Sequence, residues 1–205
     1  MHKMQNIATE IKNQSKFSLA GTDIYNGLRG KSFNECWKFH KGEITNGQSA
    51  NLDDSNWQSV TLPHDWAIYD GFSPDALSGG DGAYLDGGIG WYRKTFDIPK
   101  EYEGKNISVG FDGISELGKV WINGTYIGFR PNGYASFECD LTPYLNYDGK
   151  NVIAVRAHKN DKAARWYNGA GIYRNVWLNV LNPVHIDYCG MNVRTRNIQI
   201  GKSLI

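Results

Sequence analysis

The segment KVWINGTYIGF, residues 119–129, limits the possible folds more than any other part of the chain. Two runs of aromatic and β-branched residues flank the pair Asn123-Gly124. This pair is preferred in a two-residue type I′ turn, because both central positions of that turn need a positive φ. The segment therefore predicts a β-hairpin over residues 119–128, and with it an antiparallel sheet.

Short strand patterns recur on both sides of this hairpin. Every second residue of WYRKTFDIP, residues 91–99, faces the same side, and Ile107, Val109 and Phe111 share one face of the next run. The stretch 67–90 is glycine-rich and has no period, which indicates a long loop without regular structure that is either functional or disordered. Further strands are expected at Trp37 and Phe39 and over residues 60–62, 134–139, 151–158, 175–181 and 184–195, with one helical turn over 140–145.

These patterns amount to about eight to ten short strands separated by turn signals, with no long amphipathic helix. Such a pattern is typical of antiparallel sandwiches and jelly rolls, and it disagrees with alternating βα units. We therefore predict an all-β protein, an antiparallel jelly-roll β-sandwich over residues 31–195. Residues 1–30 are expected to be a mobile lead-in with a short helix near 7–13, and residues 196–205 a tail or the start of a missing second domain.

Composition excludes several classes of function. The 205 residues carry 22 basic and 21 acidic side chains, so a large electrostatic surface for nucleic acid or anionic membrane is not expected. A mean hydropathy of −0.50, without a long apolar run, argues against a membrane span. No phosphate-binding loop, dinucleotide fingerprint or H-E-x-x-H motif is present, and we predict neither a cofactor nor a metal site.

The cysteines and the N-terminus bear on the compartment. Cys36, Cys139 and Cys189 are odd in number and widely spaced, which argues against a disulfide framework; we expect three small apolar residues in strands. The first twenty residues lack the apolar centre of a secretory signal. Either the protein stays in the cytoplasm or a signal for the periplasm was removed before this numbering begins, and the sequence leaves both open.

One segment between two predicted strands has the composition of a sugar site. Residues 165–171, RWYNGAG, combine aromatic rings with planar hydrogen-bonding groups. The apolar face of a pyranose stacks on a ring, while its hydroxyls need placed donors and acceptors. The alternative interpretation makes Trp166 and Tyr167 core residues and Arg165 a solvated charge, and composition alone does not decide between them.

Two other groups of residues contain side chains that could act as catalytic groups. In the triplet His64-Asp65-Trp66 the carboxylate could orient the imidazole, but we favour a structural role in which Asp65 caps backbone N–H groups and Trp66 closes the sandwich edge. Asp81 and Asp86 lie in the glycine-rich loop, where exposed carboxylates are usually solvated, so a catalytic carboxylate pair is not predicted.

An ordered set of motifs resembles a known family. FNECWKFHKG (33–42), WQSVTLPHDWAI (57–68), GGIGWYRKTFDIP (87–99), the stretch from Phe111 to Leu145, NVIAVRAH (151–158) and RWYNGAGIYRNVWL (165–178) occur in family order. Together they resemble the N-terminal domain of glycoside hydrolase family 2, the β-galactosidase, β-glucuronidase and β-mannosidase group. The chain looks most like the bacterial β-galactosidases.

The resemblance implies a jelly-roll sugar-binding domain, which in the family precedes an immunoglobulin-like domain and a TIM barrel with two catalytic glutamates. Retaining hydrolysis of terminal β-galactosides is the reaction that it implies. Because a barrel alone needs about 250 residues, these 205 residues cannot contain it, and no catalytic residue and no hydrolysis are expected of this chain. The missing domains and a β-galactoside-type carbohydrate are the expected partners.

The resemblance also assigns candidate residues. It places Arg165 and Trp166 near the bound sugar, with Asn168 and Asp86 as further candidates. Some relatives carry an aspartate near position 165, where this chain has arginine, so the exact sugar stays open. Two alternatives also stay open: a free-standing carbohydrate-binding module, and a purely structural module between domains.

Overall fold

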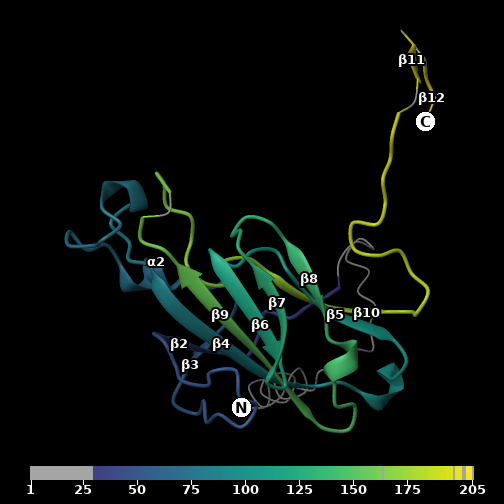
Figure 1. Cartoon of the computed structure of the whole chain (residues 1–205), viewed down its shortest axis with the longest axis horizontal. Helices are drawn as coiled ribbons and strands as arrows, with labels where there is room; N and C mark the ends of the chain where they lie inside the picture. The colour runs from purple at the N-terminus through teal and green to yellow at the C-terminus, as the bar shows by residue number, and fades with distance from the viewer. Residues whose placement is uncertain (1–29, 163, 196, 200–201, 205) are drawn as a thin grey trace, which may run out of the picture.

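A computed structural model describes residues 30–162, 164–195, 197–199 and 202–204. Two antiparallel sheets form the body of the protein (Figure 1). The larger sheet has six strands in the order β3-β2-β4-β9-β6-β7, and the smaller has four in the order β1-β10-β5-β8. Their bounds are β1 Lys31–Ser32, β2 Trp37–Lys41, β3 Gln58–Val60, β4 Gly88–Asp97, β5 Asn106–Phe111, β6 Leu117–Ile122, β7 Thr125–Arg130, β8 Phe137–Asp140, β9 Lys150–Lys159 and β10 Val176–Leu181.

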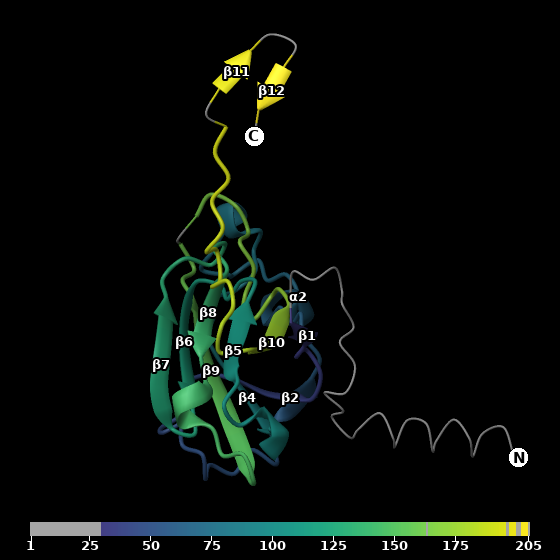
Figure 2. The ribbon, with the colours of Figure 1, turned by 90° about the vertical axis from the view of Figure 1, so that its right-hand side faces the viewer.

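The predicted all-β jelly-roll sandwich is thus confirmed. Short helices join some strands: α2 (Trp66–Asp70) and the 3-10 turns η1 (Gly80–Gly82), η2 (Lys100–Tyr102) and η3 (Thr142–Tyr144). A separate two-stranded sheet pairs β11 (Asn197–Gln199) with β12 (Lys202–Leu204), and Figure 2 shows it beyond the end of the sandwich.

The core lies between the two sheets and follows from strand alternation. The two ten-residue strands β4 and β9 pair along their whole length at the centre of the larger sheet. Val155 and Tyr92 point inward from this pair, and Ile107, Val109 and Phe111 face them from β5; all five are fully buried. Because successive side chains of a strand point to opposite faces, the three residues of β5 that the period-2 pattern places on one face all enter the core.

The predicted hairpin is confirmed in its turn as well as in its strands. β6 and β7 pair antiparallel, with Ile122 opposite Thr125 across the turn. Asn123 and Gly124 have φ values of 50° and 83°, the two positive values that a type I′ turn requires. The register shifts between Val120 and Trp121, which pair with Gly128 and Tyr126, so the extra residue lies on the edge strand β7.

The strand predicted over residues 184–195 is wrong. The structure shows no strand there, although the segment carries alternating β-branched and aromatic residues. Val184 is 93% exposed, and Ile186, Tyr188 and Val193 are also exposed. A strand needs a partner for its backbone groups, and residues 184–195 pair with no strand of the described part of the chain, although the Tyr188 hydroxyl contacts that of Ser136 beside the edge strand β8.

The structure changes the bounds or surroundings of several other predicted elements. The strand expected from residue 134 begins at Phe137, and the helical turn expected over 140–145 is η3. The loop 67–90 is not without structure, since it contains α2, η1 and the start of β4. Cys139 is buried in β8 as expected, but Cys36 and Cys189 are exposed and lie outside strands.

Two further expectations concern helices. The helix expected near residues 7–13 lies outside the described residues. Among the described residues, no helix has the length and apolar character needed to cross a membrane.

Candidate functional site

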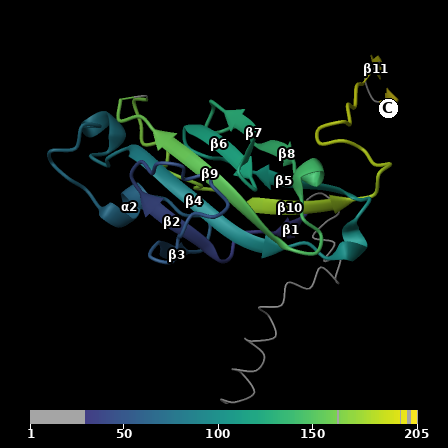
Figure 3. The ribbon, with the colours of Figure 1, turned by 60° about the horizontal axis from the view of Figure 1, so that its bottom comes forward.

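Two long connections meet at one end of the sandwich and carry the predicted site residues. One connection, residues 66–87, holds α2 and η1, and the other, residues 160–175, follows β9; Figures 1 and 3 both show them side by side. The backbone N–H of Gly87 donates a hydrogen bond of 2.6 Å to Asp161 Oδ1, which joins the two. Loops held on a rigid sandwich are a common location for binding residues.

An exposed aromatic pair lies on this end. Trp166 is 60% exposed, and its indole Nε1–H donates a hydrogen bond of 2.6 Å to the hydroxyl of Tyr134, which is 48% exposed. The Arg174 guanidinium lies 6.0 Å from the centre of the Tyr134 ring and 5.0 Å from that of Tyr173. The pair therefore presents aromatic surface to solvent, held by hydrogen bonding and by a cation–π contact.

A row of polar groups lies beside this pair. The half-buried Asn168 amide donates to Glu116 Oε1, and the Asn160 amide donates to Glu116 Oε2 over 3.0 Å. Gly133, next to Tyr134, packs against the backbone of Ser115 and Glu116, since a Cβ built on it would lie 3.3 Å from Ser115 Cα. The aromatic pair and the polar row are therefore neighbours.

The other two predicted site residues have simpler surroundings. Arg165 is exposed and makes no hydrogen bond or ion pair with the described residues. Asp86 is also exposed, and its Oδ1 accepts a hydrogen bond of 3.2 Å from the Leu77 backbone N–H within its own loop. The structure thus brings Trp166 and Asn168 into one cluster with Tyr134 and Glu116, whereas the described contacts of Asp86 stay inside residues 77–86.

Composition left open whether Trp166 and Tyr167 are core residues, and the structure gives a different answer for each. Tyr167 is half-buried against the core, as the structural interpretation expects, while Trp166 is not a core residue. The Tyr167 hydroxyl donates to the carboxylate of Asp65, and burial, together with this contact, raises the pKa of Tyr167 far above its usual value. Lys159 Nζ lies 5.4 Å from the centre of the Tyr167 ring.

The expected role of Asp65 as a cap of backbone N–H groups in its loop is wrong. Asp65 is the N-cap residue of α2, but its side chain makes no capping hydrogen bond, because its carboxylate accepts from Tyr167 instead. Trp66 has the expected role: it is fully buried and stacks on Phe39 with ring centres 5.8 Å apart.

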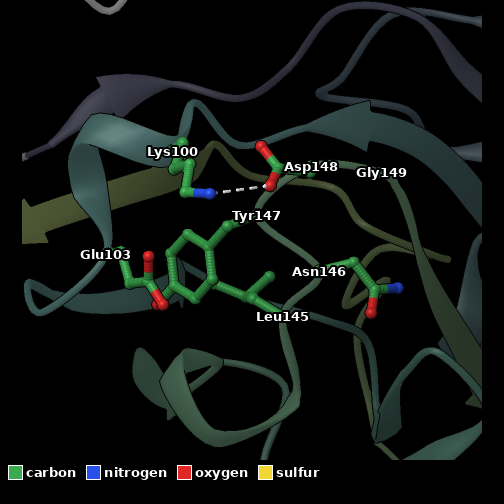
Figure 4. A pocket seen from close by; sticks show the side chains of 7 residues that line it. All are labelled: Lys100, Glu103, Leu145, Asn146, Tyr147, Asp148 and Gly149. Carbon is green, nitrogen blue, oxygen red and sulfur yellow. Dashed lines mark hydrogen bonds and ion pairs between the residues drawn. The ribbon is translucent and has the colours of Figure 1, made fainter.

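Two open cavities flank the sandwich. One, of about 520 Å³, lies between the loops at the site end and is lined by residues 77–81 with Lys162 and Ala164. The other, of about 530 Å³, lies by η2 and the start of β9, at the opposite end of that strand (Figure 4). In it the Tyr147 ring lies beside Glu103, and Lys100 pairs with Asp148 over 3.2 Å.

The donor set at the site end suits recognition of a polyhydroxylated ring. Aromatic faces are combined with carboxylate, amide and guanidinium groups at short range, which is the combination that pyranoses need. No group of three or more potential metal ligands occurs within the ranges that the structure describes. Of the residues in the cluster, sequence reasoning missed Glu116 and Tyr134, which lie 52 and 32 residues from their partners.

Fold and site together define an all-β recognition domain whose exposed aromatic and polar groups lie on loops at one end. Residues 78–182 match the family model described as glycosyl hydrolases family 2, sugar binding domain. The chain belongs to this family.

Comparison with individual proteins agrees with this assignment. The chain is 46% identical over 167 residues to a β-galactosidase of Bacteroides ovatus and 41% identical over 169 residues to a putative β-glucuronidase of Formosa agariphila. These alignments cover 81% and 82% of the chain but 20% and 16% of the relatives, so the chain spans about a fifth of their length or less.

Solved structures give the same result. A glycosyl hydrolase family 2 member from Bacteroides cellulosilyticus superposes with a TM-score of 0.78 at 41% identity, over 83% of this chain and 23% of that one. A β-glycosidase from Bacteroides vulgatus superposes with a TM-score of 0.76 at 43% identity, over 82% and 22%.

Proposed function

We propose that this chain is the sugar-recognition domain of a longer family 2 glycosidase that acts on terminal β-galactosides, and that Trp166 and Asn168 contact the sugar. The observation that carries the proposal is the exposed Trp166–Tyr134 pair beside the Asn168–Glu116 contact. Arg165 belongs to the same segment, and its exposed guanidinium is available as a further hydrogen-bond donor. Asp86 is a further candidate, on the neighbouring loop.

The wider architecture is part of the same proposal. Relatives about five times as long as the aligned region indicate that this domain works beside others. By the family resemblance these are an immunoglobulin-like domain and a TIM barrel that performs the hydrolysis. The chain by itself then supplies part of a sugar subsite, for which affinity is expected to be weak, with a Kd of about 1 mM, or about −4 kcal/mol.

The preference for galactosides rests on the β-galactosidase relative, and the putative β-glucuronidase supplies the competing sugar class. The exposed Arg165 is the feature that favours a uronate, because a guanidinium pairs well with a carboxylate. Titration with methyl β-galactoside and methyl β-glucuronide decides between the two, since the proposal expects tighter binding of the galactoside.

The test titrates the purified 205-residue chain with methyl β-galactoside and follows tryptophan fluorescence or heat. Trp166→Ala is expected to weaken binding about fivefold to tenfold, because it removes the stacking surface. Tyr126→Ala is the matched control: Tyr126 is 51% exposed, much like Tyr134, but lies on β7 away from the cluster. Equal losses in both variants, or no saturable binding by the unmodified chain, contradict the proposal.

Hydrolysis is the second readout. The chain alone is expected to leave nitrophenyl β-galactoside intact. Turnover that disappears on substitution of Asp81 or Asp86 would show a catalytic carboxylate within this domain and would overturn the division of labour proposed here.

A further inference from the structure

The triplet His64-Asp65-Trp66 touches the sugar-site segment at three separate points. The His64 backbone N–H donates a hydrogen bond of 2.9 Å to the carbonyl of Ile172. The Asp65 carboxylate accepts from the hydroxyl of Tyr167. The Trp66 ring lies under Gly171, since a Cβ built on this glycine would lie 3.0 Å from the ring carbon Cε3.

Of these three contacts, the one made by Asp65 reaches closest to the proposed sugar contacts. Tyr167 lies directly between Trp166 and Asn168 in the chain, so fixing its ring fixes the directions of both neighbours. Asp65 has no competing role as a helix cap, because its side chain makes no capping hydrogen bond. The carboxylate therefore serves the segment 165–171 rather than its own helix.

A buried cation completes this arrangement from the other side. Lys159 is only 2% exposed, and no carboxylate of the described residues lies within 4.0 Å of its ammonium group. Its Nζ faces the ring of Tyr167, whose hydroxyl points to Asp65. The ring thus contacts a cation near its face and an anion at its hydroxyl, an arrangement that favours one position of Tyr167 over others.

We infer that Asp65 is a positioning residue for sugar recognition: through Tyr167 it sets the conformation of residues 165–171 and so the placement of Trp166 and Asn168. This inference rests on the proposed function for its consequence, but not for the contact itself. A carboxylate that holds a loop through an aromatic hydroxyl acts on affinity indirectly, so its loss reduces binding without removing any sugar contact.

The experiment compares Asp65→Asn, Tyr167→Phe and the double variant in the full chain. Both single changes keep the size of the side chain while weakening or removing the hydrogen bond. Each is expected to speed tryptic cleavage of the Arg165–Trp166 bond about tenfold, because cleavage follows the population of the opened segment. The double variant should be cleaved no faster than either single one, since both substitutions remove the same contact.

Asp54→Asn is the matched control. Asp54 also accepts a strong hydrogen bond, 2.8 Å from Arg93 Nε, but on the outer side of the larger sheet. It should lower the denaturation midpoint while leaving cleavage at Arg165 unchanged. If the variants at 65 and 167 are cleaved no faster than the Asp54 variant, Asp65 does not hold the segment and the inference fails.

Sugar titration separates this inference from the proposed function. The single variants are expected to weaken methyl β-galactoside binding by the factor by which the fraction of molecules with the segment in its binding conformation falls, because the apparent Kd is inversely proportional to that fraction. An opened segment with undiminished sugar affinity overturns the positioning role. If the unmodified chain binds no sugar, the proposed function fails, and the cleavage rates still decide whether Asp65 holds the segment.

Discussion

Gly171 provides the sharpest test of the packing beneath the proposed site. Its φ is +94°, and a Cβ built there would lie 2.1 Å from the Tyr92 hydroxyl oxygen and 3.0 Å from the Trp66 ring. Gly171→Ala therefore has two costs. The positive φ costs about 1–2 kcal/mol for a residue with a Cβ, and forcing a methyl group into a packed site costs about 1–3 kcal/mol more.

The sum, about 2–5 kcal/mol, corresponds to a fall in Tm of roughly 4–20 °C for a domain of this size, at about 2–4 °C per kcal/mol. Gly124→Ala isolates the conformational cost. Gly124 has a φ of +83°, but its nearest neighbour to a built Cβ is Gln48 O at 3.9 Å, so only about 1–2 kcal/mol is expected.

Urea and thermal unfolding, followed by tryptophan fluorescence and circular dichroism, measure both variants. The structure predicts that Gly171→Ala destabilises the protein by at least about 1 kcal/mol more than Gly124→Ala does, the lower end of the overpacking cost. Equal losses would refute the close approach of Tyr92 and Trp66 to the backbone at position 171.

Three further outcomes are expected. Arg93→Met should cost about 3–5 kcal/mol in urea unfolding, because the 1% exposed Arg93 pairs with Asp54 over 2.8 Å and its loss leaves that carboxylate and the Gly47 carbonyl without this donor. A loss below about 1 kcal/mol contradicts this. Burial lowers the pKa of the His64 imidazole despite two nearby carboxylates, so as the pH falls the unfolded chain binds a proton at His64 before the folded chain does. The free energy of unfolding should therefore fall as the pH drops from 7 to 5, and fall less in His64→Gln. An equal fall in both proteins refutes this reasoning. Burial raises the pKa of the Cys139 thiol to about 12, so a thiol reagent at pH 8 should modify the two exposed cysteines quickly and Cys139 only when the protein unfolds. Rapid modification of all three cysteines would contradict the structure.

Sequence patterns were most accurate where the deciding interactions are local. The Asn123-Gly124 turn depends on the φ values of two adjacent residues, and it was predicted in full. The alternation of Ile107, Val109 and Phe111 likewise identified the inner face of β5. In both cases neighbours in the sequence determine the conformation, so the pattern carries enough information.

Predictions failed where a distant partner decides. Residues 184–195 have a strand composition, but strand formation depends on an edge to pair with, and composition does not report one. Asp65 was expected to cap backbone N–H groups of its own loop, yet its carboxylate accepts from the hydroxyl of Tyr167, 102 residues away. Sequence patterns compare only the interactions that neighbouring residues can make, so they do not show a competing partner that the fold brings from a distant part of the chain.

The residues of the candidate site also differ in whether a local sequence pattern could identify them. Arg165, Trp166 and Asn168 could be selected because a short segment held the right residue types and matched a family motif. Glu116 and Tyr134 could not, since neither belongs to a recognisable sugar-binding pattern, and each reaches the cluster only through the folding of the sandwich.

Mapping sugar-induced shifts in the amide and indole NMR signals of the chain tests most directly whether the loop end recognises sugar. Titration with methyl β-galactoside is expected to shift the Trp166 indole and Asn168 side-chain signals first, and those of Tyr134 and Glu116 with them. Shifts confined to the opposite cavity around Tyr147, or no saturable shifts at about 10 mM sugar, tenfold above the expected Kd of about 1 mM, would contradict this account.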